Sequence, residues 1–268
     1  MKWKLTVIGN PIAHSKSPLI HAEYARQSGF EVMYDKTESP LNDFKSTIQI
    51  LQKNGYYGAN VTAPFKEEAY ELSASSSDRA KIARAANILI FLADGSIHAD
   101  NADGSGLITD IQINHTYALK NKKILILGAG GAVRGILYPI LQTNPQVVII
   151  ANRTESKAKS LADEFSHYGK ILPSVFNEMN DDDYDVIIDA TSFDAWPLPV
   201  SDKIFTHCSL VYDLKYSHEL TPVLEKATRY GVKKCLNGFG MLVEQAADAF
   251  ALWTGFKPDT AALLKDKI

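Results

Sequence analysis

The chain has 268 residues, 46% hydrophobic and 22% charged, with a formal net charge of −3 and a pI near 6.2. This length allows two ordinary domains, and the slightly acidic balance argues against a nucleic-acid or anionic-membrane surface. The two cysteines, Cys208 and Cys235, are too few and too far apart for a disulfide framework or a metal cluster. No window approaches a transmembrane span, and the N-terminal apolar run is too short for a signal peptide. We therefore expect a reducing, cytoplasmic compartment.

The N-terminal stretch predicts a short strand at residues 5–8 and then a helix. Ser17 followed by Pro18 favours a helix start, because a hydroxyl N-cap and a proline at the first helical position are both preferred there, and Gly29 favours its end. Ser15 and Ser17 allow two interpretations. They are capping residues only, or their hydroxyls form a small polar cradle suited to a carboxylate or a polyol.

Three polar residues cluster where the next predicted strand, 59–62, meets a helix start: Asn60, Thr62 and Lys66. Such positions are common sites of ligand contact in α/β folds. A lysine at a helix N-terminus is unfavourable to the helix dipole, which favours a task for Lys66, although a solvated surface lysine is the simpler interpretation. The same region predicts a strand at 30–34 and a helix at 41–51.

A hairpin and a polar cluster follow. Residues 80–86 predict a helix, and Asp94-Gly95 predicts a tight turn between strands at 87–91 and 96–99. The cluster 100–104 holds two carboxylates, of which Asp103 has a simple interpretation as the cap of the helix near Leu107.

The middle of the chain carries a glycine cluster between a strand and a helix. The apolar run 124–127 breaks into Gly128, Gly130 and Gly131, an amphipathic segment follows, and a second apolar strand ends at Ala151. This β-α-β spacing predicts a dinucleotide site, with a pyrophosphate at the helix N-terminus. The third glycine of the usual pattern is replaced by Val133, so a tight turn without a ligand is the alternative.

The end of that second strand distinguishes the two nicotinamide dinucleotides. An NAD site usually carries an acidic residue there for the ribose 2′-hydroxyl, whereas this chain reads Asn152-Arg153-Thr154. Arg153, Thr154 and Lys157 suit a 2′-phosphate through charge-assisted hydrogen bonds, which favours NADP. A solvated loop charge at Arg153 is the alternative.

The remaining chain alternates strands and helices, which predicts a parallel, doubly wound sheet. Gln245 lies on an otherwise apolar stripe of the last predicted helix and needs a partner, either a buried structural hydrogen bond or a ligand. The predicted elements are helices at 156–165, from 221–222 to near 231, and from 238–240 onward, with strands at 185–189 and 210–213.

Six stretches together resemble the successive signatures of the shikimate dehydrogenase family, in the right order and spacing. They are Gly9–Pro18, Asn60–Lys66, Asp100–Gly104, Gly128–Ala132, Asn152–Thr154 and Gly238–Gln245. The family reduces 3-dehydroshikimate to shikimate with NADPH, in the pathway to chorismate and the aromatic amino acids. The resemblance implies an NADP-dependent oxidoreductase acting on a CH–OH group of a small molecule, without a metal, as a monomer or homodimer.

The resemblance also implies site residues. Lys66 would be the acid/base with Asp103 beside it, and Ser15 and Ser17 would hold the substrate carboxylate. Asn60, Thr62, Asn87, Tyr216 and Gln245 would bind the rest of the substrate. The cofactor would contact Gly128, Ala129, Gly130, Gly131, Ala132, Asn152, Arg153, Thr154, Lys157, Thr191, Leu214, Gly238 and Met241.

We expect two domains on this basis. Residues 1–102 plus 238–268 would form an α/β substrate-binding and catalytic domain, and residues 103–237 an NADP-binding Rossmann domain. The active site is expected in the cleft, with Lys66 and Asp103 on one wall and the nicotinamide, near Gly238 and Met241, on the other.

Three departures from the family pattern motivate alternatives. Ile88 and Ala102 replace threonines, which removes hydroxyls expected to support neighbouring site residues. The segment Asp189–Ala195 replaces an Asn-Ala-Thr-Ser stretch and its glycine turn, which places bulk and negative charge near the cofactor face. The alternatives are a quinate/shikimate dehydrogenase-like paralogue and a non-catalytic NADP-binding sensor, although retention of both Lys66 and Asp103 argues against a sensor.

Overall fold

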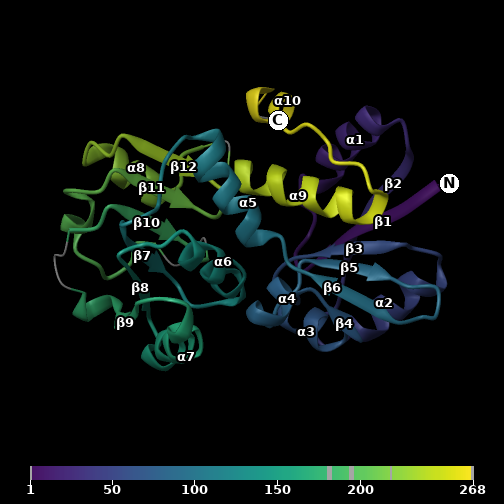
Figure 1. Cartoon of the computed structure of the whole chain (residues 1–268), viewed down its shortest axis with the longest axis horizontal. Helices are drawn as coiled ribbons and strands as arrows, with labels where there is room; N and C mark the ends of the chain where they lie inside the picture. The colour runs from purple at the N-terminus through teal and green to yellow at the C-terminus, as the bar shows by residue number, and fades with distance from the viewer. Residues whose placement is uncertain (1, 180–182, 193–195, 218, 267–268) are drawn as a thin grey trace. The chain divides into compact units, whose positions relative to one another are not determined.

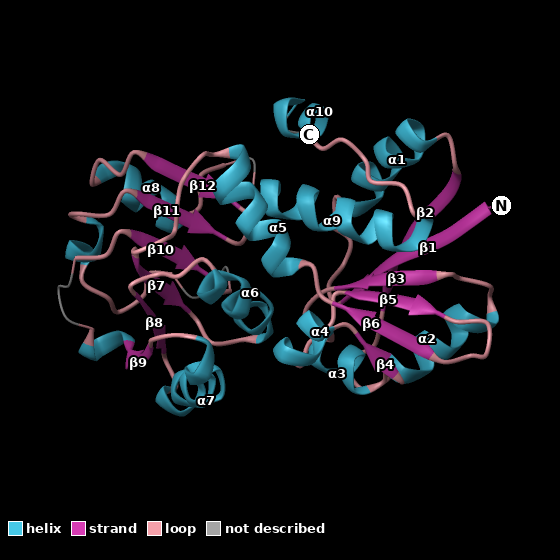
Figure 2. Ribbon diagram, viewed as in Figure 1, coloured by secondary structure: helices cyan, strands magenta, loops and turns pink. Residues whose placement is uncertain are grey.

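The computed structural model describes residues 2–179, 183–192, 196–217 and 219–266 (Figure 1). It divides into two compact units, residues 1–106 with 242–268, and residues 107–241. Both are α/β, each built on its own six-stranded sheet of described residues (Figure 2). The boundaries expected from the sequence lie slightly earlier in the chain. The predicted α/β class is confirmed.

The first unit contains a mixed sheet in the order β2-β1-β3-β5-β6-β4. Strands β1, β2 and β3 are parallel, whereas β5 runs antiparallel to β3 and β6, as the predicted hairpin requires. Its strands are β1 (Lys2–Gly9), β2 (Glu31–Glu38), β3 (Gly58–Val61), β4 (Ser75–Ser76), β5 (Ile88–Phe91) and β6 (Ile97–Asp100). Its helices are α1 (Ser17–Ser28), α2 (Phe44–Lys53), α3 (Lys66–Glu71), α4 (Asp78–Ala83) and α10 (Ala261–Asp266).

Two helices carry the chain from one unit to the other, α5 (Asp103–Thr109) and α9 (Phe239–Thr254). Beyond Met241, α9 packs within the first unit, where Ala249 and Trp253 join a buried cluster with Leu5 and Ile88. The Tyr24 hydroxyl of α1 donates to the carbonyl oxygen of Val243 over 2.8 Å. The last long helix therefore completes the core of the unit that begins the chain.

The second unit is a parallel sheet in the order β12-β11-β10-β7-β8-β9. Chain order reverses between β7 and β10, which makes their carboxyl ends the usual ligand-binding edge of a Rossmann sheet. The strands are β7 (Lys123–Leu127), β8 (Val147–Asn152), β9 (Ile171–Val175), β10 (Val186–Asp189), β11 (Leu210–Asp213) and β12 (Lys234–Asn237). The helices are α6 (Gly131–Gln142), α7 (Glu155–Phe165) and α8 (Pro222–Arg229), with a π-helical segment η1 (Asp110–Asn114) and 3₁₀ segments η2 (Ser166–Tyr168), η3 (Phe176–Glu178) and η5 (Asp202–Phe205). The predicted doubly wound sheet is confirmed.

Some local predictions were wrong. Helix α4 begins at Asp78, earlier than expected, because the Ser77 hydroxyl caps it by accepting from the backbone N–H of Ala80 over 3.2 Å. Ser17 is not the N-cap of α1, since Lys16 occupies that position. The last long helix is followed by α10, which the sequence pattern did not indicate.

Two properties of the described residues bear on function. No helix among them is long and apolar enough to cross a membrane. No group of three or more histidine, cysteine, aspartate or glutamate side chains in the described ranges could hold a metal ion.

Candidate active site

A lysine and an aspartate form an ion pair in the first unit. Lys66 is the first residue of α3, and Asp103 is the first residue of α5. Nζ of Lys66 donates to Oδ2 of Asp103 over 2.6 Å, and the exposed fractions of the two side chains are 16% and 6%. A pair this little exposed holds the ammonium group in one direction, which a proton donor requires. The two residues proposed for catalysis are therefore in direct contact.

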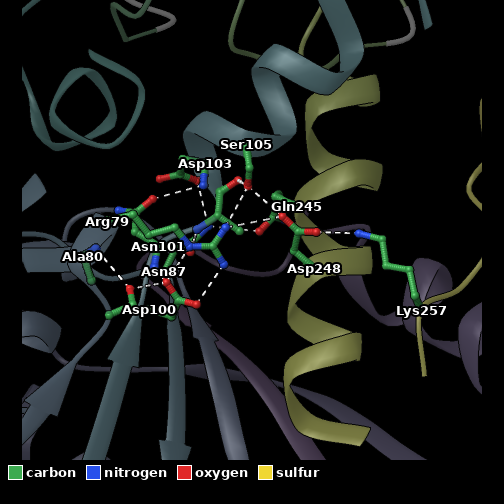
Figure 3. Close-up of polar contacts among 12 residues, drawn as sticks. Arg79, Ala80, Asn87, Asp100, Asn101, Asp103, Ser105, Gln245, Asp248 and Lys257 are labelled. Atoms are coloured by element: carbon green, nitrogen blue, oxygen red, sulfur yellow. Dashed lines mark hydrogen bonds and ion pairs between the residues drawn. The ribbon is translucent and has the colours of Figure 1, made fainter. Parts of the chain in front are cut away.

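Asn87 links this pair to helix α9 (Figure 3). Its Nδ2 atom donates to Oδ1 of Asp103 over 2.8 Å and to Oε1 of Gln245 over 3.0 Å. Its Oδ1 atom accepts from the backbone N–H of Ala102 over 2.9 Å. Both amide hydrogens and the amide oxygen of Asn87 are thus used inside the protein. Asn87 fixes Asp103 and Gln245 relative to each other.

A second set of polar contacts holds the loop that carries Asp103. Arg79 donates to both carboxylate oxygens of Asp100, over 2.6 and 2.8 Å (Figure 3). Oδ1 of Asp100 also accepts from the backbone N–H of Asn101 over 2.6 Å. The side chain of Asn101 in turn accepts from the backbone N–H of Asp103 over 3.0 Å. Because consecutive backbone groups are bound by buried side chains, the loop holds Asp103 in place.

Asn60, in β3, is bound on both sides of its amide. Its Oδ1 atom accepts from the Tyr34 hydroxyl over 2.6 Å and lies 3.2 Å from Nε2 of His21. Its Nδ2 atom donates to the carbonyl oxygen of Asn87 over 3.1 Å. Sequence reasoning missed Tyr34 and His21, because a tyrosine in a strand and a histidine in a helix carry no pattern that separates them from ordinary core residues.

Ser15 and Ser17 lie next to each other and are buried. Oγ of Ser15 donates to Oγ of Ser17 over 3.2 Å and accepts from the backbone N–H of Ser17 over 3.3 Å. Neither hydroxyl caps α1 in the usual way, so the capping interpretation of Ser17 is wrong. Near these serines, a continuous run of hydrogen bonds leads from Tyr34 through Asn60 and Asn87 to Asp103.

Two other residues expected at the substrate, Thr62 and Tyr216, each lie beyond the end of a strand. Thr62 follows β3 and is half-buried, and its backbone N–H donates to the carbonyl oxygen of Ile8 over 2.9 Å. Tyr216 follows β11, is also half-buried, and belongs to the second unit rather than the first.

The two positions at which this chain lacks the family's threonine hydroxyls lie in an apolar core. Ile88 and Ala102 are both fully buried, and they belong to one cluster with Leu5, Ala249 and Trp253. The adjoining polar positions remain bonded, since Asn87 accepts from the backbone of Ala102 rather than from a side chain at that position. Asn87 and Asp103 are thus hydrogen-bonded without a hydroxyl at either position.

The change Ile88→Thr should lower stability without affecting substrate binding. It would place a hydroxyl in this closed apolar cluster, which costs about 1–3 kcal/mol in the free energy of unfolding. Ile50→Thr is the control, because Ile50 is 58% exposed and its change should cost less than about 0.5 kcal/mol. Urea unfolding measures both variants. A lowered KM for substrate in Ile88→Thr would mean that the hydroxyl has a functional role.

The second unit contains a pocket of about 510 Å³ at the carboxyl ends of its strands. The glycine turn forms one side, and Gly128 adopts φ +108° there, a conformation that favours glycine. None of the described lining residues carries a carboxylate, whereas Arg153 and Lys157 are cationic. A cavity of this charge, ending at the N-terminus of α6, fits a dinucleotide that carries an extra phosphate.

Eight of the residues expected at the cofactor line this pocket. They are Gly128, Ala129, Gly130, Asn152, Arg153, Thr154, Lys157 and Thr191. Sequence reasoning missed Phe176, Ala190, Ser192, Leu198 and Pro199, which have no phosphate-binding signature. The other expected residues are outside the lining: Gly131, Ala132, Leu214, Gly238 and Met241.

Gly238 precedes α9 and Met241 lies in its first turn, both within the second unit, and both are held by neighbouring residues. A Cβ atom at Gly238 would collide with the backbone of Leu214. The backbone N–H of Met241 donates to the Tyr212 hydroxyl over 3.2 Å, and that hydroxyl donates to the buried carboxylate of Asp110 over 2.7 Å. The start of α9 is therefore fixed against β11 and η1.

The acidic residue that ends β10 does not line the cofactor pocket. Asp189 is fully buried, and its carboxylate accepts from Thr191 over 2.6 Å, from the Trp196 indole over 2.7 Å and from Lys215 over 3.2 Å. Asp189 is not among the residues that line the cofactor pocket, and Lys215 compensates its charge inside the protein. Phe193, Asp194 and Ala195 lie outside the described residues.

Asp213, paired with Asp189 across β10 and β11, should make stability depend on pH. Burial, with the nearby Asp189 carboxylate, raises the pKa of Asp213 from 3.8 to about 6. The folded protein then binds this proton more tightly than the unfolded chain does. Protonated Asp213 therefore contributes to the free energy of unfolding below about pH 4, and this contribution is lost as pH rises through 6. Asp213→Asn should remove this decline in the free energy of unfolding, which is on the order of 2–3 kcal/mol. Urea midpoints between pH 4 and 7 test this, and parallel curves for the two proteins would contradict it.

Three protein-family models match successive parts of the chain. The shikimate dehydrogenase substrate binding domain matches residues 7–89, shikimate / quinate 5-dehydrogenase matches 111–200, and the shikimate 5'-dehydrogenase C-terminal domain matches 238–265. A shikimate dehydrogenase (NADP(+)) from Nitrosospira multiformis is 45% identical over 96% of this chain and 94% of its own length. The chain belongs to the shikimate dehydrogenase family.

Two solved structures have the same fold as this chain. An Ael1 enzyme from Pseudomonas putida superimposes with a TM-score of 0.89 at 41% identity, covering 99% of this chain and 98% of that one. Shikimate 5-dehydrogenase from Thermus thermophilus, in complex with NADP(H) and shikimate, gives a TM-score of 0.85 at 28% identity, covering 98% and 97%. Family membership thus extends over both units.

Proposed function

We propose that this chain is an NADP-dependent shikimate dehydrogenase, which reversibly reduces 3-dehydroshikimate to shikimate in the pathway to chorismate and the aromatic amino acids. Membership of the family supports this, as do the names of relatives such as the one from Nitrosospira multiformis. The single observation that carries the chemistry is the contact of 2.6 Å between Nζ of Lys66 and Oδ2 of Asp103.

Lys66 is the proposed acid/base. Reduction of a ketone needs a proton at the carbonyl oxygen, and an ammonium group held by a carboxylate can donate that proton and stabilise the negative charge that develops. In the reverse direction the amine accepts it. Asp103 orients Lys66 and accepts a hydrogen bond from Asn87. NADPH supplies the hydride when it is bound.

The substrate is proposed to bind in the first unit. The adjacent hydroxyls of Ser15 and Ser17 suit a carboxylate, which accepts several hydrogen bonds. Asn60, Thr62, Asn87 and Gln245 are proposed for the ring and its hydroxyls, of which Asn87 acts mainly by ordering its neighbours. Tyr216 is proposed as a further substrate-binding residue.

NADP is proposed to bind in the second unit. Arg153, Thr154 and Lys157 would hold the 2′-phosphate, and the turn at Gly128–Gly131 would hold the pyrophosphate. We propose the first unit as the substrate-binding and catalytic domain and the second as the Rossmann domain. The remaining cofactor contacts proposed are Ala132, Asn152, Thr191, Leu214, Gly238 and Met241.

A cytoplasmic location and a monomeric or homodimeric state complete the proposal. Both cysteines, Cys208 and Cys235, are free, as a reducing compartment requires.

The assay follows NADPH absorbance with 3-dehydroshikimate, and NADP or NAD reduction with shikimate or quinate. We expect turnover of shikimate with NADP to exceed turnover with NAD or with quinate. No turnover of shikimate by the native protein would overturn the proposal. Equal use of quinate would instead identify a quinate/shikimate dehydrogenase-like paralogue, and binding of NADP without any turnover would identify a sensor.

A further inference from the structure

His21 is a fully buried histidine with no role in the chemistry described above. It lies in α1 and is 0% exposed. Its ring stacks on Tyr34, with ring centroids 4.1 Å apart and an angle of 10° between the planes. Trp253 and Phe250 of α9 lie at centroid distances of 5.6 and 6.1 Å. An apolar aromatic side chain would suit these surroundings better than an imidazole.

The neighbours of Asn60 decide which nitrogen of His21 carries the proton. Nδ2 of Asn60 must face the carbonyl oxygen of Asn87, because two oxygen acceptors would repel. Oδ1 of Asn60 therefore faces the other way, where it accepts from Tyr34 and lies 3.2 Å from Nε2 of His21. For that contact to be a hydrogen bond, the imidazole must carry its hydrogen on Nε2.

The opposite nitrogen of the ring bears an energetic cost. Nδ1 of His21 is buried and has no hydrogen-bond partner among the described residues. Burial lowers the pKa of His21 to about 3, so the ring is neutral and Nδ1 remains an unpaired acceptor. An unsatisfied buried polar atom costs about 1–3 kcal/mol. A residue that serves only for packing offers no compensation for this cost.

We propose that His21 is a positioning residue for Asn60. With Tyr34 it occupies the acceptor positions of Oδ1, so that Asn60 can offer a ligand only an amide N–H. Nδ2 carries two hydrogens, and the carbonyl oxygen of Asn87 takes one of them. The group bound there is therefore an acceptor oxygen of the substrate. The inference rests on the proposed function, since that substrate is taken to be shikimate.

The test separates binding from stability. In His21→Phe the ring can still stack, but the donor to Asn60 and the unpaired Nδ1 are both removed. We expect KM for shikimate to rise about five- to tenfold, from the loss of one ordering hydrogen bond, with KM for NADP and kcat unchanged within about twofold. The melting temperature should stay equal or rise. His21→Gln keeps an N–H donor and should restore KM to within about twofold of the native value.

A nearby tyrosine supplies the matched control. Tyr24→Phe also removes a buried hydrogen-bonding group next to His21, but that hydroxyl donates to Val243 and not to Asn60. It should lower the melting temperature and leave KM for shikimate unchanged. If His21→Phe does not fold, His21→Leu makes the same comparison. A lowered melting temperature with an unchanged KM in the His21 variant would overturn the proposal.

Nitrogen NMR of the histidine-labelled native protein tests the arrangement without any substrate. We expect His21 to carry hydrogen on Nε2 and to remain neutral between pH 5 and 8. Hydrogen on Nδ1 would overturn the proposal whether or not shikimate is turned over. A native protein that shows the Nε2 form but does not oxidise shikimate would refute the proposed function alone.

Discussion

Lys66→Ala is expected to lower kcat for shikimate oxidation by roughly 10²- to 10⁴-fold, the usual contribution of a positioned general acid or base. The expectation follows from the geometry of the pair. The ammonium group is 2.6 Å from Asp103, and its side chain is only 16% exposed, so water does not readily replace it in the same position. The measurement is steady-state turnover with shikimate and NADP.

Two comparisons make the Lys66 result specific. Binding of NADP, followed by fluorescence or calorimetry, should be unchanged, because Lys66 belongs to the first unit and the proposed dinucleotide pocket to the second. Lys81→Ala, at an exposed lysine of α4, should retain native turnover. A Lys66→Ala variant that keeps more than a tenth of native kcat would show that another group transfers the proton.

Arg153→Ala is expected to raise KM for NADP by about 10- to 100-fold while KM for NAD changes little. Arg153 lines the pocket at the end of β8, where the described lining holds no acidic side chain. A charged hydrogen bond to a phosphate contributes about 1.5–3 kcal/mol, which corresponds to this range. Since NAD lacks the 2′-phosphate, the same change removes little from its binding.

The control for Arg153 is a lysine on the neighbouring helix. Lys159 is an exposed cation of α7 that does not line the pocket, so Lys159→Ala should affect NADP and NAD alike, and only slightly. Steady-state kinetics with both dinucleotides compares the variants. Equal losses with NADP and NAD in Arg153→Ala would mean that Arg153 contacts the part of the cofactor that both share, and the preference for NADP would then need another source.

The elements predicted best from the sequence are those specified by neighbouring residues. The apolar run 124–127, the glycines after it and the second strand near Ala151 predict a β-α-β unit, and the structure contains it as β7, α6 and β8. Local signals carry this information because strand burial and turn conformation are decided within a few residues.

The contacts that build the candidate site could not be predicted in this way. Asn87 binds Gln245 across 158 positions, and no periodic pattern specifies that pairing. The sequence showed that Gln245 needs a partner without showing which one. Asp189 is the opposite case. Its charge is evident in the sequence, but the compensation by Lys215 depends on two strand ends lying side by side.

The discontinuity of the first unit has a consequence for how the protein is made. Leu5, Ile88 and Ala102 leave the ribosome long before Ala249 and Trp253, with which they form one buried cluster. The Trp253 indole also donates to the carbonyl oxygen of Leu89 over 3.1 Å. Part of the apolar surface of the N-terminal sheet therefore stays uncovered while the second unit is translated. Synthesis of α9 then completes both the core and, through Gln245, the candidate active site, so a prematurely terminated chain lacks both.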